Sequence, residues 1–294
     1  GNREMALEDF SAIRQLPDGG GTGILEIRAA ALHQECSLLL QMEQYDRLRE
    51  ITSEIPADLT GHAGREVRSH LMAVLRSRQQ ALEKLDLPGD MVDNADRILE
   101  LFRGENPLEF RMHLGHTYLE KIRCAYRLRK HDLVDATRED LEDFVQDSTG
   151  DPHLQDLLVQ ALVISGNDLS ETGAYREALE VFGRTLSAGP GATEELLRGQ
   201  VQARYRTGQI HQGMGREREA LKAFQEIEKS HSGSRDPVIR PLVLKSILEQ
   251  SQLQADRSGG LFGRSQLRRV LARYTQVEQQ ARGQKDPEMV KIFL

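Results

Sequence analysis

The sequence contains no tryptophan, only two cysteines and few aromatic residues, which make up 5% of its 294 residues. Cys36 and Cys124 are too few and too far apart for a disulfide scaffold, and no zinc-ligand spacing occurs. We therefore expect both to be buried thiols in a reducing compartment. No segment approaches the ~20 apolar residues of a membrane span, and no signal-peptide pattern opens the chain. These absences predict a soluble, cytoplasmic protein with no membrane association.

Alternating β-branched residues, which would indicate strands, are also missing. Leu, Ala, Glu, Gln and Arg dominate instead, and these residues favour helices. The formal net charge is -7, which argues against a nucleic-acid groove because such grooves need a positive surface. We expect an all-α protein.

Two segments repeat the same pattern of small and aromatic residues forty-two positions apart. The pairs are Gly166 and Gly208, Gly173 and Gly215, Ala178 and Ala220, and Phe182 and Phe224. A period of this length, made of two amphipathic helices, predicts a solenoid in which each helix pair buries its apolar face against its neighbours.

Residues 159–190, and less closely residues 201–232, resemble the tetratricopeptide repeat (TPR) helix pair in the spacing of these positions. The resemblance implies a right-handed superhelical solenoid of antiparallel helix pairs. The repeat here is longer than the roughly 34 residues of a TPR unit. We therefore expect the first helix of each pair to be about two turns longer than is usual in the family.

The same period is predicted along the rest of the chain from two signals. Buried small positions are expected at Ala95, Thr137, Ala178 and Ala220, with Leu48 and Leu267 extending the series through steps lengthened by loop insertions. Helix starts are expected at Asn106, Asp151, Thr193, Asp236 and Asp286, where a side-chain acceptor can cap the first turn. Both series predict repeating helix pairs.

Three segments follow from this pattern. Residues 1–60 are expected to form N-terminal helices that act as a degenerate repeat or cap, and residues 61–285 the extended TPR-like array. Residues 286–294 read as the start of a further, truncated repeat. We interpret the chain as a fragment of a longer protein in which other domains could be catalytic.

The family resemblance also implies a binding surface, because TPR arrays bind peptides on the concave face of the superhelix. Its contact positions, carried onto this sequence, are Tyr126, Arg129, Lys130, Gln160, Asn167, Ser170, Glu171, Gln202, Tyr205, Gln209 and Gln212. The tyrosines would offer an aromatic shelf, and the amides would pair with a peptide backbone. The leading hypothesis is a non-enzymatic protein- or peptide-binding or sensing scaffold with no cofactor.

Two alternatives remain open. His113 and His116, three residues apart with Glu109 and Glu120 nearby, are the only candidates for an all-helical enzyme. Arginines in residues 257–273 could instead serve a nucleic-acid-binding helical repeat.

Charge also suggests self-association. An acidic helix, with Asp135, Glu139, Asp140, Glu142, Asp143 and Asp147, could meet a basic one, with Arg264, Arg268, Arg269 and Arg273, in a second copy of the chain. A solvated outer face explains the same pattern.

Overall fold

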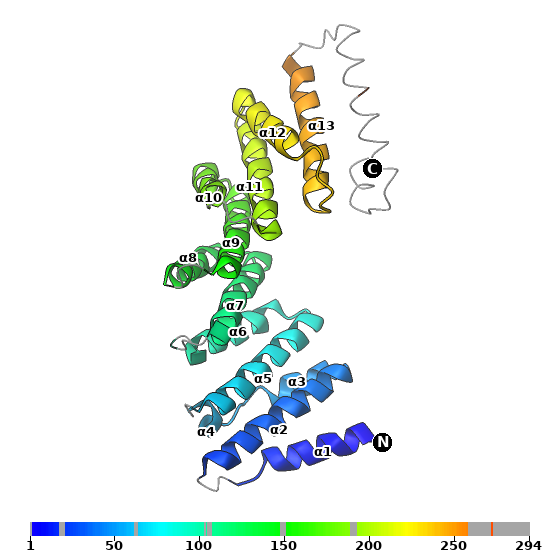
Figure 1. The fold of residues 1–294 in the computed structure, drawn as a ribbon, viewed down its shortest axis with the longest axis vertical. Coiled ribbons are helices and arrows are strands. Elements are labelled where there is room, and N and C mark those ends of the chain that lie inside the picture. Colours follow the sequence, from blue (N-terminus) through cyan, green and yellow to red (C-terminus); the bar gives the residue numbers. More distant parts are fainter. Residues whose placement is uncertain are drawn as a thin grey trace. The chain divides into compact units, whose positions relative to one another are not determined.

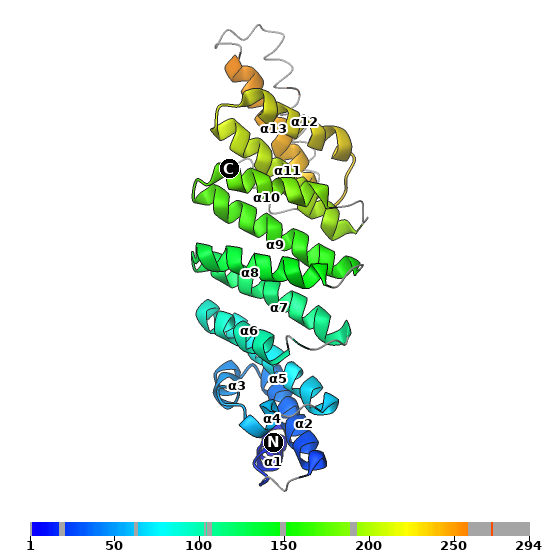
Figure 2. The ribbon, with the colours of Figure 1, turned by 90° about the vertical axis from the view of Figure 1, so that its left-hand side faces the viewer.

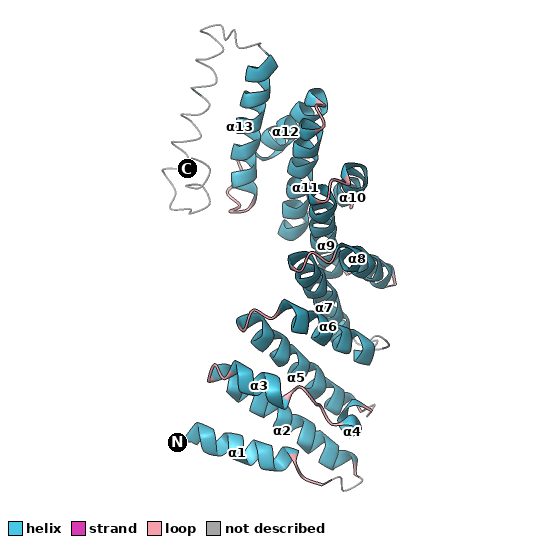
Figure 3. Cartoon of the chain, turned by 180° about the vertical axis from the view of Figure 1, so that it is seen from behind, coloured by secondary structure: helices cyan, strands magenta, loops and turns pink. Residues whose placement is uncertain are grey.

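The computed structural model describes residues 2–17, 21–61, 64–102, 104, 108–147, 151–188, 193–257 and 272. Within these ranges the protein forms thirteen helices and no strand. Figures 1 and 3 show how these helices follow one another along the chain. The prediction of an all-α chain is confirmed. In the same ranges, no helix combines the length and the apolar character needed to cross a bilayer.

The chain divides into two compact units, Gly1–Phe144 and Val145–Leu294. The first unit carries α1 (Asn2–Arg14), α2 (Thr22–Gln41), α3 (Tyr45–Ile51), α4 (Ala57–Thr60), α5 (Arg65–Lys84), α6 (Pro88–Phe102), α7 (Leu108–Arg127) and most of α8 (His131–Gln146). The second carries α9 (Pro152–Glu171), α10 (Tyr175–Ser187), α11 (Glu194–Gly213), α12 (Glu217–His231) and α13 (Ile239–Arg257). This division falls inside the predicted 61–285 array, and residues 286–294 lie outside the described ranges.

One turn geometry recurs five times in the described chain. After α9, the N–H of Gly173 donates to the carbonyl of Ser170 at 3.2 Å, and the N–H of Ala174 donates to that of Leu169 at 2.8 Å. These two bonds form a Schellman motif, which places its central residue in the left-handed region. The central residues, all with positive φ and the same bonding pattern, are Glu43, Asp86, Arg129, Gly173 and Gly215.

These turn residues are 43, 43, 44 and 42 positions apart, so five helix pairs follow one another with a nearly constant period. The pairs are α2 with α3, α5 with α6, α7 with α8, α9 with α10, and α11 with α12. In the last four pairs the first helix has 20 residues and the second has 13 to 16. The first helix is therefore the longer one in each of these pairs.

The turns correct the predicted series of small residues. Ala178 and Ala220 stand five positions after their turn residue, whereas Ala95 stands nine and Thr137 eight positions after theirs. The structural equivalents in α6 and α8 are Met91 and Val134, and with Leu48 they keep the constant period without any loop insertion. Ala95 and Thr137 are also buried, but they lie about one helical turn after Met91 and Val134. The sequence pattern therefore selected a buried residue that is not the structural equivalent of Ala178 and Ala220. Leu267 lies outside the described residues.

Close backbone approach explains the small residues of the second unit. A Cβ added to Gly166 would lie 2.5 Å from the ring of Phe182, and one added to Gly208 would lie 2.5 Å from the ring of Phe224. Both rings are fully buried. Glycine at this position, seven residues before the turn, lets each second helix press its aromatic ring against the first. Figure 2 shows α9 to α12 as successive layers, in which α11 also contacts α9, α10 and α13.

Side-chain caps begin the helices at three predicted positions. Asp151 accepts from the N–H of His153 at 2.9 Å, and Thr193 accepts from that of Leu196 at 3.1 Å. The carboxylate of Asp236 accepts from the N–H of Val238 at 2.8 Å. The predicted starts at 106 and 286 lie outside the described residues.

The first unit stacks its helices in the same serial way, since α2 contacts α1 and α5, and α6 contacts α5 and α7. Its first helices carry polar or larger residues where the second unit has glycine. Gln79 stands seven residues before its turn, as Gly166 and Gly208 do, and is hydrogen-bonded to Asn94 of α6 at 2.8 Å. A hydrogen-bonded amide pair thus replaces the glycine–phenylalanine contact.

Candidate ligand-binding groove

The residues predicted to bind a partner are spread over both units. In the second unit, Gln160 and Asn167 on α9 and Gln202 and Gln209 on α11 are half-buried, and they share one face because each pair is seven residues apart. Residues Ser170, Glu171 and Gln212 follow at the ends of the same helices, Glu171 exposed and the other two half-buried. These residues form a polar strip on two neighbouring helices.

Tyr205 lies in the core instead of on this strip. Its side chain packs with Val201 and Ile227, and its ring centroid lies 5.7 Å from that of Phe224. The residue is 7% exposed, and its hydroxyl accepts from the side-chain amide of Gln209 at 3.3 Å. Burial, followed by the nearby charge of Glu249, raises the pKa of Tyr205. The ring is therefore not available as the expected aromatic shelf.

The remaining predicted residues lie at the end of α7 in the first unit. Arg129 is the left-handed turn residue, and its guanidinium lies 5.8 Å from the ring centroid of Tyr126. Lys130 is exposed, and its N–H completes the turn by donating to the carbonyl of Ala125 at 3.0 Å. The structure thus gives Arg129 and Lys130 backbone roles in this turn.

Two adjoining cavities lie between α5 and α7 and share Arg76 and Gln80 in their walls. We call them together the α5–α7 groove. The histidine cavity, of about 470 Å³, also reaches α2 and is lined by His33, His70 and His113. The carboxylate cavity, of about 280 Å³, also reaches α6 and is lined by Glu83 and Glu120.

The position of His113 can be compared with equivalent positions in the other repeats. His70, His113 and Gly199 each stand sixteen residues before their turn residue, so they occupy equivalent positions. A Cβ added to Gly199 would lie 2.3 Å from the side chain of Val159, so α11 and α9 are in close contact there. An imidazole cannot fit into such a contact. His113, at the same position of α7, lines the histidine cavity beside α5.

The histidine cavity holds a close pair of imidazoles. The Nδ1 atoms of His33 and His70 are 3.2 Å apart, so one ring donates and the other accepts. Burial, and then the proximity of His70, lower the pKa of His33. Both effects favour the neutral form of this ring.

The histidines considered for an enzyme do not converge. His113 lines the histidine cavity, whereas His116 lines neither cavity and is exposed. Partial burial, and then the charges of Arg76 and Arg123, lower the pKa of His116. Among the residues with assigned positions, no group of three or more His, Cys, Asp or Glu could hold a metal ion.

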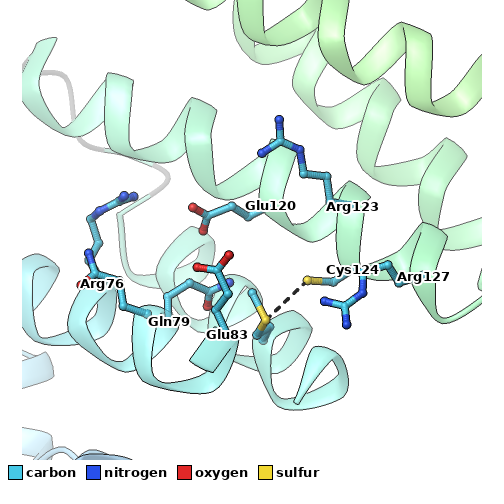
Figure 4. A pocket seen from close by; sticks show the side chains of 9 residues that line it. Arg76, Gln79, Glu83, Glu120, Arg123, Cys124 and Arg127 are labelled. Atoms are coloured by element: carbon cyan, nitrogen blue, oxygen red, sulfur yellow. Dashed lines mark hydrogen bonds between the residues drawn. The ribbon is translucent and has the colours of Figure 1, made fainter. Parts of the chain in front are cut away.

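The carboxylate cavity is shown in Figure 4. Glu83 of α5 and Glu120 of α7 come from opposite walls and point toward each other, whereas the guanidinium of Arg123 points away from them. Burial raises the pKa of Glu120 despite the opposing charges of Arg76 and Arg123, and Glu83 adds to the increase. Glu120 is therefore a carboxylate whose charge the protein compensates incompletely.

Several polar groups around this cavity lack partners. Gln79 is 6% exposed, and its Oε1 accepts from Asn94, but its Nε2 has no hydrogen-bond partner in the described part of the chain. Across the same ranges, Arg76, Glu83 and Glu120 make no hydrogen bond or close ion pair, although Arg76 and Glu120 are near enough for their charges to interact. Arg127, by contrast, pairs with Asp86. Of these groups only Gln79 Nε2 is buried and carries the free-energy cost of an unsatisfied donor, since Glu83 is exposed and Arg76 and Glu120 are half-buried.

One wall of the cavity is apolar and is formed by Met91 and a protonated thiol, Cys124. The Sγ atom of Cys124 lies 3.8 Å from the sulfur of Met91. Burial raises the pKa of Cys124 to about 11, so its thiol stays protonated. Both cysteines are free and buried, which confirms that part of the prediction.

The predicted acidic face of α8 is partly neutralised by its own helix. Arg138 is buried and contacts Glu142 at 2.8 Å, Glu139 at 3.2 Å and Asp135 at 3.7 Å. The predicted basic partner, residues 264–273, falls almost wholly outside the described residues.

Sequence reasoning named only parts of the groove. His113 and Glu120 were singled out, but as candidates for catalysis, and Arg76, Gln79 and Glu83 were not. The signal that could have found the groove is the spacing of 43 residues between His70 and His113, which equals the repeat. Neither known protein families nor curated proteins give a match to this chain.

Proposed function

We propose that the protein is a non-enzymatic scaffold that binds an extended peptide or a partner domain along the α5–α7 groove. The observation that carries this proposal is the pair of adjoining cavities on successive first helices, joined at Arg76 and Gln80. Imidazoles, amides, carboxylates and guanidiniums line the groove, and such groups pair with the backbone and side chains of a peptide.

The proposal includes a second contact surface and a family relationship. The polar strip of Gln160, Asn167, Gln202 and Gln209 supports additional contacts in the second unit. Five helix pairs with one turn geometry support an extended TPR-like array, for which we propose a right-handed superhelix. A cytoplasmic location is part of the same proposal.

A library of random peptides displayed on phage tests the function. Peptides enriched on the wild-type protein should bind the double variant Arg76→Ala, Gln80→Ala roughly tenfold more weakly or worse, because both residues face the two cavities. The matched control is Arg218→Ala, Gln225→Ala, which changes the same residue types on the exposed surface of α12. The control should bind like the wild type.

Two results would overturn the proposal. One is the absence of any enriched peptide. The other is a set of enriched peptides that bind the groove variant as tightly as the control.

A further inference from the structure

We propose that the histidine cavity binds a phosphate monoester, carried by a phosphorylated side chain of the peptide that the α5–α7 groove holds. This inference rests on the proposed function and adds to it the chemical class of the ligand. Three features of the cavity support it, namely the donors in its walls, the groups among them that have no partner, and its size.

The described walls of the cavity carry hydrogen-bond donors and no acidic side chain. Imidazoles come from three first helices, with His33 on α2, His70 on α5 and His113 on α7. Arg76 adds a guanidinium, and two serines and Gln80 add neutral donors. Since the chain holds 46 acidic and 39 basic residues, its average composition does not account for such walls. They suit an anion.

The pair of imidazoles keeps a donor for a ligand. The hydrogen bond between His33 and His70 uses the Nδ1 atom of each ring. In the neutral pair, the ring that accepts this bond carries its own proton on Nε2 and can donate it elsewhere. A phosphate dianion would also stabilise the protonated form of either ring, which has two donors.

A second, independent observation is a buried hydroxyl without a partner. Ser77 is 8% exposed and lines the cavity, yet its side chain makes no hydrogen bond within the described chain. Its Oγ atom is not among the unpartnered side-chain atoms that lack accessible surface, so a ligand in the cavity can reach it. Ser69 and Arg76 line the same cavity and likewise make no hydrogen bond or close ion pair in these ranges. A bound anion would give all three an acceptor.

The size of the cavity suits a phosphorylated side chain. Ser69, Ala73 and Ser77 follow one another at intervals of four on α5, so three small side chains share one face of this helix. The volume of about 470 Å³ lies within the range of small-molecule sites. Met72 and Phe110 add apolar surface, against which the carbon atoms of the ligand's side chain can pack.

The arrangement of the donors favours phosphate over a carboxylate or a metal ion. They come from three helices, and a phosphate monoester presents three oxygens in different directions, whereas a carboxylate presents two in one plane. The guanidinium of Arg76 repels a metal ion, and the described chain offers no group of three metal ligands. Glu120, in the neighbouring cavity, attracts Arg76 only at a distance, and a phosphate in direct contact would interact more strongly.

Peptide libraries with one fixed phosphoserine, phosphothreonine or phosphotyrosine among random positions test the assignment on the full chain. Selected peptides should bind at least tenfold more tightly than the same peptides without the phosphate, because the phosphate adds charge-assisted hydrogen bonds. Arg76→Gln should remove most of this tenfold difference. Arg218→Gln, at an exposed position on α12, is the matched control and should keep it.

A second variant and a competition experiment sharpen the result. Ser77→Ala should weaken phosphopeptide binding about threefold or more, because it removes one neutral donor. Alanine is smaller than serine and favours helices, and circular dichroism verifies that each variant is folded. Inorganic phosphate should displace a labelled phosphopeptide from the wild-type protein. If single-stranded RNA displaced it at a lower concentration of phosphate groups than inorganic phosphate does, the ligand would be a nucleic acid and the assignment would be wrong.

Equal binding of phosphorylated and unphosphorylated peptides would refute this assignment and leave the scaffold function standing. So would a phosphate-dependent difference that is the same in Arg76→Gln and Arg218→Gln. Inorganic phosphate that binds in an Arg76-dependent way, with no binding of any peptide, would instead refute the scaffold function and with it the peptide as the source of the phosphate.

Discussion

The contact between Gly208 and Phe224 gives the sharpest test of how the helix pairs are packed. In Gly208→Ala, the added methyl group would lie 2.5, 2.8 and 3.0 Å from three atoms of the Phe224 ring. The ring is fully buried and cannot turn into solvent, so α11 and α12 must move apart. Such overpacking costs about 1–3 kcal/mol. The gain of roughly 1 kcal/mol in helix propensity from Gly to Ala opposes it. We expect a net loss of up to about 2 kcal/mol in the free energy of unfolding.

The repeat supplies both a replicate and a control. Gly166→Ala should cost a similar amount, because the ring of Phe182 lies 2.5 Å from that added Cβ as well. Gly183 lies inside α10, is exposed and has no atom within 4 Å of an added Cβ. Gly183→Ala should therefore stabilise the protein, by about 0.5–1 kcal/mol.

Urea denaturation followed by circular dichroism at 222 nm measures these differences. Adding Phe224→Leu to Gly208→Ala should recover part of the loss, because the smaller side chain leaves room for the methyl group. If Gly208→Ala were more stable than the wild type, the close approach of the two helices would be wrong. The same conclusion would follow if Gly208→Ala and Gly183→Ala shifted stability equally.

Three further predictions concern the turn, the thiols and the imidazole pair. Arg129→Gly should raise the free energy of unfolding by about 0.5–1 kcal/mol in the same assay, because φ is +57° there and glycine adopts this region without strain; a loss of stability would contradict the turn. Burial raises the pKa of Cys36 to about 12 and that of Cys124 to about 11, so a thiol reagent at neutral pH should label them only as fast as the protein unfolds; rapid labelling of the folded protein would refute their burial. The pKa of His33 is lowered in the folded state, so the unfolded state binds the proton more tightly, and this contribution to stability should be lost as pH falls below about 6.5. His70→Gln should raise the pKa of His33 in an NMR titration without restoring its ordinary value, since burial is the larger cause; an unchanged pKa would exclude the predicted coupling.

The helical class and the repeat of the second unit could be predicted because the decisive residues there are chemically distinctive. Gly173 and Gly215 mark left-handed turns, and Asp151 and Thr193 mark helix starts. In the first unit the same turns are formed by Glu43, Asp86 and Arg129, of which only Asp86 is of a residue type that favours turns. The backbone hydrogen bonds of the turn hold these residues in the left-handed region without a glycine. Because the sequence lacks a glycine at these turns, the turns could not be located from the sequence.

The groove was not predicted because it depends on the distance between two helices that are far apart in the sequence. Whether His113 fills a contact or borders a cavity is decided by the distance to α5, which the composition of α7 alone does not specify. Tyr205 is the opposite case, because a residue expected on the surface is buried in the core. A position assigned to the binding face by family resemblance is occupied by a ring that packs against Phe224.

The recurring turn makes the chain divisible into interchangeable modules. Removing residues 174–215 would join Gly173 directly to Arg216, so that α9 would be followed by α12 across a Schellman turn. Gly166 would then face Phe224, because each glycine precedes its turn by seven residues and each phenylalanine follows its turn by nine. A shortened protein made in this way keeps a complementary hairpin at the junction, and an inserted copy of the same segment would lengthen it by the same rule.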